Sequence, residues 1–237
     1  MLYKETVEAG TLDLILRLAK DEMLAAFYLA GDTALSLQIG HRVSVDIDLC
    51  CNSSLDAVRL SGHLATKYKA ESIKTLNDDV SCFVEAVKVD LRADRYTLVQ
   101  PPVLIEAIRM ASTEEIGAVK LKAIVAGSNR FTDFVDLYSL LEHNTLEELT
   151  DVFEKKYPAM SRSMVTKALS QHNEIVPASV TFTGQEVTGR DLDYRFKKAL
   201  GEPKRIFETV PWQRQTAKKA RGDQQSPDKS RGKGWRP

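Results

Sequence analysis

The sequence has few cysteines and no long run of apolar residues. Its three cysteines, Cys50, Cys51 and Cys82, show no metal-ligand spacing and are too few for a disulfide framework, which favours a reducing compartment. No segment approaches the roughly eighteen apolar residues of a membrane span, and the N-terminal residues lack the cationic start and apolar run of a secretory signal. We therefore expect a cytoplasmic protein with no membrane segment.

A net charge is also absent, because 33 basic side chains balance 33 acidic ones. The balance is uneven along the chain: residues 211–237 contain eight Lys or Arg and two Asp, a surplus of plus 6, so residues 1–210 carry minus 6. A basic tail of this kind can hold a polyanion such as RNA, but it is more often a solvated end. We predict a disordered tail over residues 211–237.

What the sequence does contain is a compact unit over residues 27–51. Its apolar start, residues 27–30, is typical of a short buried strand, and the apolar spacing of residues 33–39 predicts a helix. Between them Gly31 predicts a tight turn. A glycine at a strand-to-helix junction lets phosphate approach the backbone N–H groups at the positive end of the helix. The junction, with Gly31 and Thr33, is therefore a candidate phosphate site.

Three aspartates follow on predicted strands. From Val43 the side chains alternate, which places Asp46 and Asp48 on one strand face, and the same alternation over residues 87–91 places Asp90 on a neighbouring strand. An Asp-x-Asp pair alone is a weak signal. Buried carboxylates need a cation, however, and nucleotidyl transfer uses two Mg²⁺ ions about 4 Å apart. Together with the glycine turn, the three carboxylates predict a metal site.

The remaining pattern predicts an α/β protein in which strands give way to helices. Apolar spacing predicts helices over residues 11–29, 55–68, 113–126, 131–142, 146–156, 161–169 and 191–200, and further strand segments over residues 72–76, 80–86 and 103–110. Two prolines at positions 101 and 102 mark the change of character. We expect a core over residues 1–110 and a helical domain over residues 111–210.

At these positions the sequence resembles the abortive-infection AbiEii-type nucleotidyltransferases of the DNA polymerase beta-like superfamily. The family's usual Gly-Gly-Thr-Ala-Leu motif falls on residues 31–35, and its His-Arg-x-Ser-x-Asp-x-Asp segment matches residues 41–48 without a gap. Its Lys-Leu-x-Ala helix falls on residues 120–123, and its Asp-Phe-x-Asp-Leu-Tyr helix on residues 133–138. The order and spacing of these separate matches make the resemblance specific.

The resemblance implies a polymerase beta-like core with a mixed sheet, followed by a helical domain that closes over the nucleotide. It implies transfer of an NMP unit from an NTP with two Mg²⁺ ions; in studied relatives the acceptor is often the 3′ end of tRNA, and the enzyme is the toxin paired with an antitoxin protein. The implied catalytic and metal-holding residues are Asp46, Asp48 and Asp90, with Asp90 also the base. The implied nucleotide-binding residues are Gly31, Asp32, Thr33, Arg42, Ser44 and Lys120, supported by Asp133 and Asp136.

The sequence departs from the family pattern at two positions. Asp32 replaces the second glycine, either as an ordinary helix N-cap or as a negative charge that harms triphosphate binding. Arg130 lies about three residues later than the family's usual arginine, so we leave it out of the core site. Arg42 is expected to pair with Asp46 or Asp48 when no metal is bound.

Simpler interpretations compete with these roles. Lys120 lies on an apolar helix, where lysine stems often extend to solvent, and Asp133 and Asp136 could form an exposed helical face. Two rival functions stay open. A catalytically weak or inactive nucleotide-binding module, acting through RNA or protein binding, predicts metal and NTP binding without product. An unrelated helical interaction protein predicts no metal binding.

Overall fold

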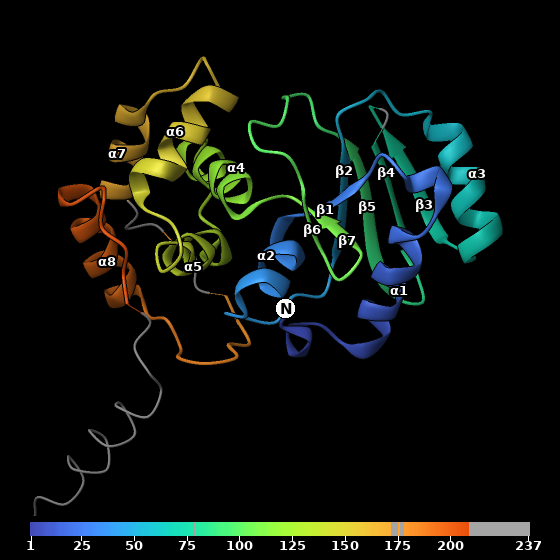
Figure 1. Cartoon of the computed structure of the whole chain (residues 1–237), viewed down its shortest axis with the longest axis horizontal. Coiled ribbons are helices and arrows are strands. Elements are labelled where there is room, and N and C mark those ends of the chain that lie inside the picture. The colour runs from blue at the N-terminus through green and yellow to red at the C-terminus, as the bar shows by residue number, and fades with distance from the viewer. Residues whose placement is uncertain (78, 172–174, 176–177, 209–237) are drawn as a thin grey trace, which may run out of the picture. The chain divides into compact units, whose positions relative to one another are not determined.

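The computed structural model describes residues 1–77, 79–171, 175 and 178–208, and Met1–Phe207 forms one compact unit (Figure 1). The tail predicted over residues 211–237 lies outside the described residues. Within the compact unit a sheet precedes a group of helices along the chain. The predicted fold class, an α/β core followed by helices, is confirmed.

The sheet is mixed and has seven strands. They are β1 (Tyr28–Ala30), β2 (Ile47–Cys51), β3 (Glu71–Leu76), β4 (Asp79–Val84), β5 (Val87–Ala93), β6 (Val103–Ile105) and β7 (Ile108–Met110). Their order is β3-β4-β5-β2-β1-β7-β6, with β2/β5 and β1/β7 parallel and the other neighbours antiparallel. Strand β2 is therefore central and lies directly beside both β1 and β5.

Some helices lie beside the sheet, and the helices that follow the last strand form a group of their own. They are η1 (Lys4–Thr6), α1 (Ala9–Ala19), η2 (Glu22–Leu24), α2 (Gly31–Ile39), α3 (Ala57–Tyr68), α4 (Thr113–Val125), α5 (Phe131–Leu140), α6 (Leu146–Lys156), α7 (Arg162–Ser170) and α8 (Gly189–Gly201). Figure 1 shows α1 and α3 beside the sheet, α4 to α8 grouped together, and α2 between the two groups. Among the described residues, none of these helices is both long and apolar enough to span a membrane.

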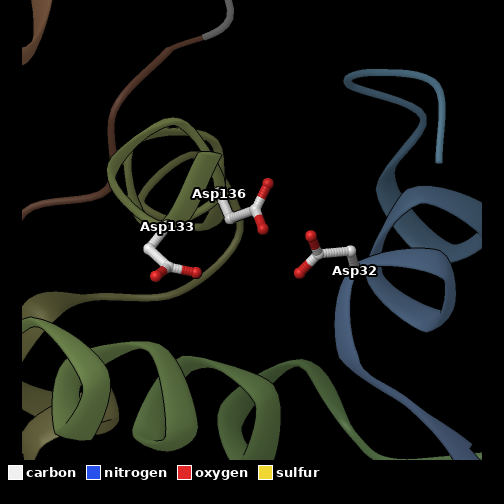
Figure 2. A group of neighbouring side chains, drawn as sticks. All are labelled: Asp32, Asp133 and Asp136. Atoms are coloured by element: carbon white, nitrogen blue, oxygen red, sulfur yellow. The ribbon is translucent and has the colours of Figure 1, made fainter. Parts of the chain in front are cut away.

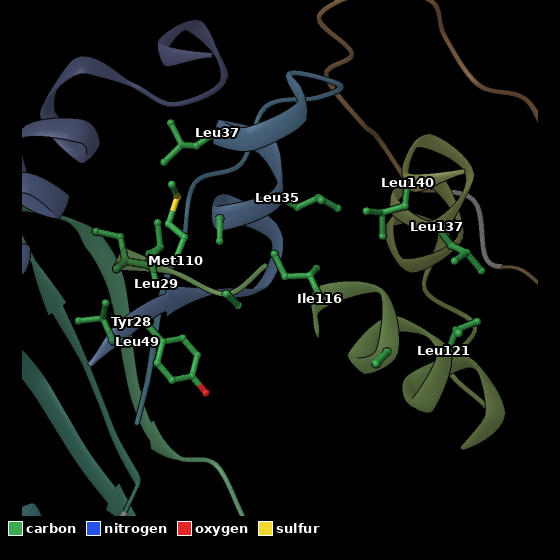
Figure 3. Close-up of a cluster of buried hydrophobic side chains, with 14 of the residues drawn as sticks. Tyr28, Leu29, Leu35, Leu37, Leu49, Met110, Ile116, Leu121, Leu137 and Leu140 are labelled. Carbon is green, nitrogen blue, oxygen red and sulfur yellow. The ribbon is translucent and has the colours of Figure 1, made fainter. Parts of the chain in front are cut away.

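Helix α2 is buried because it packs on both groups. Leu35 and Leu37 are 0% exposed, and Figure 3 shows α2 between Leu29 of the sheet and Leu140 of α5. The helix ends at Gly40, whose φ of 71° forms a left-handed cap directly after the predicted helical residues 33–39. Sheet and helices are therefore joined through the element that follows the glycine turn.

Two local predictions are wrong. The strand expected from Val43 begins at Ile47, and Val45 is 59% exposed. The cause is a distant segment, because the Val43 N–H donates to the Thr181 carbonyl (2.8 Å) and the preceding residues follow a loop. The helix expected from residue 55 begins at Ala57, directly after Asp56, whose carboxylate caps it by accepting the N–H three residues later.

The carboxylate of Asp21 fastens η2 to α3. It is buried and lies 2.7 Å from His63 Nε2, 2.7 Å from the Tyr68 hydroxyl and 3.1 Å from Lys67 Nζ. Burial opposes ionisation, but these contacts outweigh it and lower the pKa of Asp21 to about 2. A lowered carboxyl pKa stabilises the folded protein above the ordinary value of 3.8, and this stabilisation is lost as the pH falls through about 2.

Asp21→Asn is expected to lower the free energy of unfolding by about 2 kcal/mol at neutral pH. The difference from wild type should shrink between roughly pH 4 and pH 2, which urea unfolding at several pH values measures. Asp13→Asn, at an exposed carboxylate of α1, is the control. A loss that does not change with pH would contradict the charge-based explanation.

Candidate active site

A pocket of about 570 Å³ lies where β2, β5, α2 and α4 meet. It is lined by nine of the residues predicted for the site: Gly31, Asp32, Arg42, Ser44, Asp46, Asp48, Asp90, Lys120 and Asp133. The other two, Thr33 and Asp136, are fully buried at 0% exposure. Motifs separated by up to about a hundred residues in the sequence thus meet in one cavity.

Asp48 and Asp90 lie side by side on two parallel strands. The register of β2 and β5 pairs their Cα positions. The Arg92 guanidinium reaches both carboxylates, with Nη2 2.6 Å from Asp90 Oδ2 and Nη1 3.7 Å from Asp48 Oδ1. Asp46 is exposed and precedes β2 by one residue. The three predicted metal ligands therefore line the same pocket, with two of them in direct register.

The carboxylates of Asp48 and Asp90 lie in different electrostatic surroundings. Burial raises the pKa of Asp48, Arg92 opposes this, and the neighbouring Asp90 adds to it. For Asp90, burial is outweighed by Lys88, Ser81 and Arg92, which lower its pKa; of these, Lys88 and Arg92 donate to its Oδ2. Its buried Oδ1 has no hydrogen-bond partner among the described residues. These oxygens suit Mg²⁺, which prefers carboxylate ligands, so the residues present fit a metal ion.

A second carboxylate group comprises Asp32, Asp133 and Asp136. One oxygen of each lies within 4.8 Å of the others, a grouping consistent with metal binding in a nucleotidyltransferase site, and Figure 2 shows the three carboxylates turned toward one another from α2 and α5. Among the described residues this is the group that meets that distance condition, so Asp46, Asp48 and Asp90 do not meet it.

Lys120 supplies the cation at the centre of this second group. Its ammonium lies 2.5 Å from Asp32, 2.8 Å from Asp133 and 2.6 Å from Asp136. Burial opposes protonation of Lys120, but the three carboxylates outweigh it and raise its pKa. The alternative in which the lysine extends to solvent is wrong, because the side chain is 6% exposed. In this structure the Lys120 ammonium is the shared ionic partner of all three carboxylates.

Arg42 is also held by these carboxylates. The predicted pairing with Asp46 or Asp48 is wrong: Nε and Nη2 lie 2.6 and 2.9 Å from the two oxygens of Asp136, and Nη2 lies 2.9 Å from Asp32. Such a two-pronged contact suits the planar guanidinium, and burial on the helix side favours it over the more exposed strand aspartates. Arg42 therefore joins the loop before β2 to α5.

Asp136 is the most enclosed of the charged groups. It accepts from Lys120, Arg42 and His41, whose Nε2 lies 2.8 Å away, and burial is outweighed by these contacts, so its pKa lies well below the ordinary value. An exposed helical face, the alternative interpretation of Asp133 and Asp136, is wrong, since they are 4% and 0% exposed. From α5, these two aspartates fix Lys120 and Arg42 in position.

Asp32 is not a helix N-cap. The cap position is Ala30, and Asp32 lies in the first turn of α2 with its carboxylate directed at Lys120 rather than at a backbone N–H. The helix starts at Gly31, two residues earlier than expected, and Gly31 itself has a positive φ of 65°, which glycine adopts readily. Arg130 also approaches, with Nη2 3.6 Å from Asp32, and it lines the pocket.

Thr33 and Ser44 position the loop that carries Asp46, the first of the predicted metal ligands. Thr33 Oγ1 lies 2.8 Å from Ser44 Oγ and donates to the backbone carbonyl of Asp46. The Thr33 hydroxyl is therefore engaged inside the protein, while Ser44 lines the pocket. Both residues tie α2 to the start of β2.

Gly31 is required sterically as well as conformationally. A Cβ at this position would lie 2.6 Å from Asp48 Oδ2, closer than a real Cβ contact. We expect Gly31→Ala to weaken Mg²⁺ binding at least roughly tenfold and to lower the free energy of unfolding by about 1–2 kcal/mol. Calorimetric Mg²⁺ titration and urea unfolding test this. Gly62→Ala on α3, where a Cβ meets nothing within 4 Å, should leave Mg²⁺ binding unchanged; equal metal affinity in both variants would contradict the steric argument.

The sequence interpretation missed several charged residues of the pocket. Lys88 and Arg92 flank Asp90 two residues to either side, so strand alternation was a signal that could have found them. Lys156 of α6 is buried 2.9 Å from Asp94 and 3.0 Å from Glu115. No local pattern marks that contact, because 62 residues separate Lys156 from Asp94.

Comparisons with known proteins extend over the whole site. A family model described as "Nucleotidyl transferase AbiEii toxin, Type IV TA system" matches residues 13–209, which include every predicted site residue. An uncharacterized protein of Aquifex aeolicus is 28% identical over 149 residues, 60% of this chain and 72% of that protein. Among solved structures, JHP933 from Helicobacter pylori is 17% identical with a TM-score of 0.46, over 92% of this chain and 100% of that one. A Thermotoga maritima CCA-adding enzyme complexed with tRNA is 16% identical with a TM-score of 0.35, over 73% and 53%.

Proposed function

Because the chain belongs to the AbiEii family of nucleotidyltransferase toxins of type IV toxin–antitoxin systems, we propose that its pocket transfers an NMP unit from an NTP to a hydroxyl group of an acceptor RNA. The observation that supports this site is the register of β2 and β5, which pairs Asp48 with Asp90 beside the Gly31 turn. The acceptor that best fits the proposal is the 3′ end of tRNA, and an antitoxin protein is the expected partner.

We assign metal binding to Asp46, Asp48 and Asp90. Two bound Mg²⁺ ions would supply an activated attacking oxygen and neutralise charge on the triphosphate. The raised pKa of Asp48 and the unpartnered Oδ1 of Asp90 support this assignment. In the reaction the acceptor oxygen bonds to the α-phosphorus, the bond from that phosphorus to pyrophosphate breaks, and the acceptor proton passes to Asp90.

We assign triphosphate binding to the start of α2 and the cations beside it. The N–H groups after Gly31 lie at the positive end of a helix, and Lys120, Arg42 and Ser44 line the same part of the pocket. Asp133 and Asp136 keep Lys120 and Arg42 charged and fixed in position. Phosphate recognition would thus combine backbone donors with two buried cations.

Two partly exposed cations, Lys88 and Arg92, lie beside the strand aspartates, where they could contact an acceptor RNA. The side chains of Lys88 and Arg92 are 40% and 51% exposed, and both contact Asp90. When a metal ion neutralises Asp90, their charge becomes available to phosphate groups of the acceptor. Lys88 and Arg92 would then contact Asp90 in the free protein and RNA phosphates in the complex, and so bring the end of the RNA to the metal site.

The proposal is tested by supplying each labelled NTP in turn with Mg²⁺ to the purified protein and total tRNA. Incorporation of label by wild type and not by Asp48→Ala would support transfer to tRNA and identify the nucleotide. Label on another RNA or on protein would show that tRNA is not the acceptor. No incorporation with any NTP or acceptor would overturn the transferase assignment.

A second function is favoured by one observation, the contacts of Asp32 with Lys120 and Arg42. A carboxylate that occupies phosphate-binding cations would suit a catalytically weak nucleotide-binding module that acts through RNA or protein binding. NTP and Mg²⁺ binding in calorimetry without any labelled product would select this function.

A further inference from the structure

The Asp32 carboxylate lies among three cations of the pocket, Lys120, Arg42 and Arg130. Its Oδ1 is 2.5 Å from Lys120 Nζ, and its Oδ2 is 2.9 Å from Arg42 Nη2 and 3.6 Å from Arg130 Nη2. Its side chain is 24% exposed, whereas those of Lys120 and Arg42 are 6% and 5% exposed. Asp32 is therefore the pocket-facing partner of two buried cations.

The charges around Asp32 balance without any bound anion. Lys120, Arg42 and Arg130 contribute three positive charges, and Asp32, Asp133 and Asp136 contribute three negative ones. Burial lowers the pKa of the neighbouring His41 despite Asp136, so it adds no charge near neutral pH. Without Asp32 the same group would carry one surplus positive charge facing the cavity.

The position of Asp32 is also where an incoming phosphate needs donors. It is the second residue of α2, directly after Gly31, so its carboxylate lies at the helix end whose N–H groups attract anions. Asp133 and Asp136 contact the same cations from α5, on the far side of the group (Figure 2). Of the three carboxylates, Asp32 is thus the one that a phosphate would have to displace.

We propose that Asp32 is an internal competitor of the triphosphate: it occupies Lys120 and Arg42 in the free protein and so sets the affinity and phosphate selectivity of the pocket. This inference rests on the proposed nucleotide site. A phosphate chain binds by taking over the contacts of Asp32, and the carboxylate must move toward Arg130 or solvent. Loss of its negative charge removes both the competition and the repulsion.

The test compares Asp32→Asn and Asp32→Gly with wild type in calorimetric titrations with inorganic tripolyphosphate and Mg²⁺. Asn keeps the shape of the side chain, and Gly removes it, so either variant that folds is sufficient. We expect at least tenfold tighter binding in both variants. Unchanged or weaker binding would overturn the proposal.

Two matched variants separate competition from general charge effects. Asp32→Glu keeps the charge and should show no tenfold gain. Asp56→Asn removes an exposed charge outside the pocket, at a helix cap that Asn also supports, and should bind as wild type does. If Asp56→Asn and Asp32→Asn bound tripolyphosphate equally more tightly than wild type, the change in net charge would explain the effect and the role of Asp32 would be overturned.

The readout is independent of transfer to any acceptor. Tighter tripolyphosphate binding in Asp32→Asn, together with no NMP transfer by wild type or variant, would uphold the competitor and reject the proposed reaction. NMP transfer by wild type, together with an unchanged tripolyphosphate affinity in Asp32→Asn, would support the proposed reaction and reject the competitor.

Discussion

Asp48→Asn is expected to lower the rate of nucleotide transfer by about a thousandfold and, in the absence of Mg²⁺, to raise the free energy of unfolding. The substitution removes the charge of a proposed metal ligand without changing the shape of its side chain. In the free protein the charge of Asp48 is unfavourable. Burial raises its pKa, Arg92 opposes this without cancelling it, and Asp90 raises the pKa further. Function and stability should therefore move in opposite directions.

The pH dependence of this effect has a definite sign. A carboxyl whose pKa is raised in the folded protein destabilises the fold once it ionises, so the gain from Asn is full near neutral pH. The gain disappears as the pH falls below the ordinary value of 3.8, where the carboxyl is protonated in both states. Urea unfolding in EDTA at several pH values measures it, with Asp56→Asn as the control. A variant that loses both activity and stability would show that Asp48 is structural.

Lys120→Met is expected to lower the free energy of unfolding by about 3–5 kcal/mol, because it removes one partner of a buried ionic group. Methionine fills a similar volume, so the loss comes from charge. Asp32, Asp133 and Asp136 would keep their negative charges with Arg42 as the remaining buried cation. The deficit should shrink at acidic pH, where protonation relieves the carboxylates.

Lys122→Met on the same helix is the matched control. The Lys122 ammonium lies 5.5 and 5.4 Å from the ring centres of Tyr96 and Tyr157, a contact worth about 1 kcal/mol or less at a partly exposed site. Urea unfolding of both variants provides the comparison. A loss in Lys120→Met no larger than that in Lys122→Met would mean that the buried carboxylates do not depend on the ammonium.

The elements of the fold could be predicted because their signals are local. The helix α2 follows from apolar spacing between Gly31 and Gly40, and the strand β5 from alternation around Asp90, so each is encoded within a few residues. The start of β2 could not be predicted in this way. The residues from Val43 onward alternate as a strand does, yet a hydrogen bond to the distant Thr181 takes them out of the sheet.

The partners inside the site were beyond local reasoning. Asp32 looked like a helix cap because its sequence neighbours suit one, but its actual partner Lys120 is 88 residues away. Arg42 looked available to Asp46 or Asp48, but Asp136, 94 residues away, offers a buried two-pronged contact. Sequence motifs thus identified which residues gather in the pocket, while packing between helices decided which charges neutralise one another.

The loop that carries Arg42 depends partly on the second half of the chain, where it contacts Asp136 on α5 and the backbone of Thr181. A polypeptide cut after residue 110 would retain Asp46, Asp48 and Asp90 but would leave the Arg42 guanidinium, 4% exposed in the intact protein, with Asp32 and without the two-pronged contact to Asp136. The half that holds Asp46, Asp48 and Asp90 is therefore unsuited to independent expression. Two such halves should be harmless to a host cell alone and regain toxicity only when they reassociate.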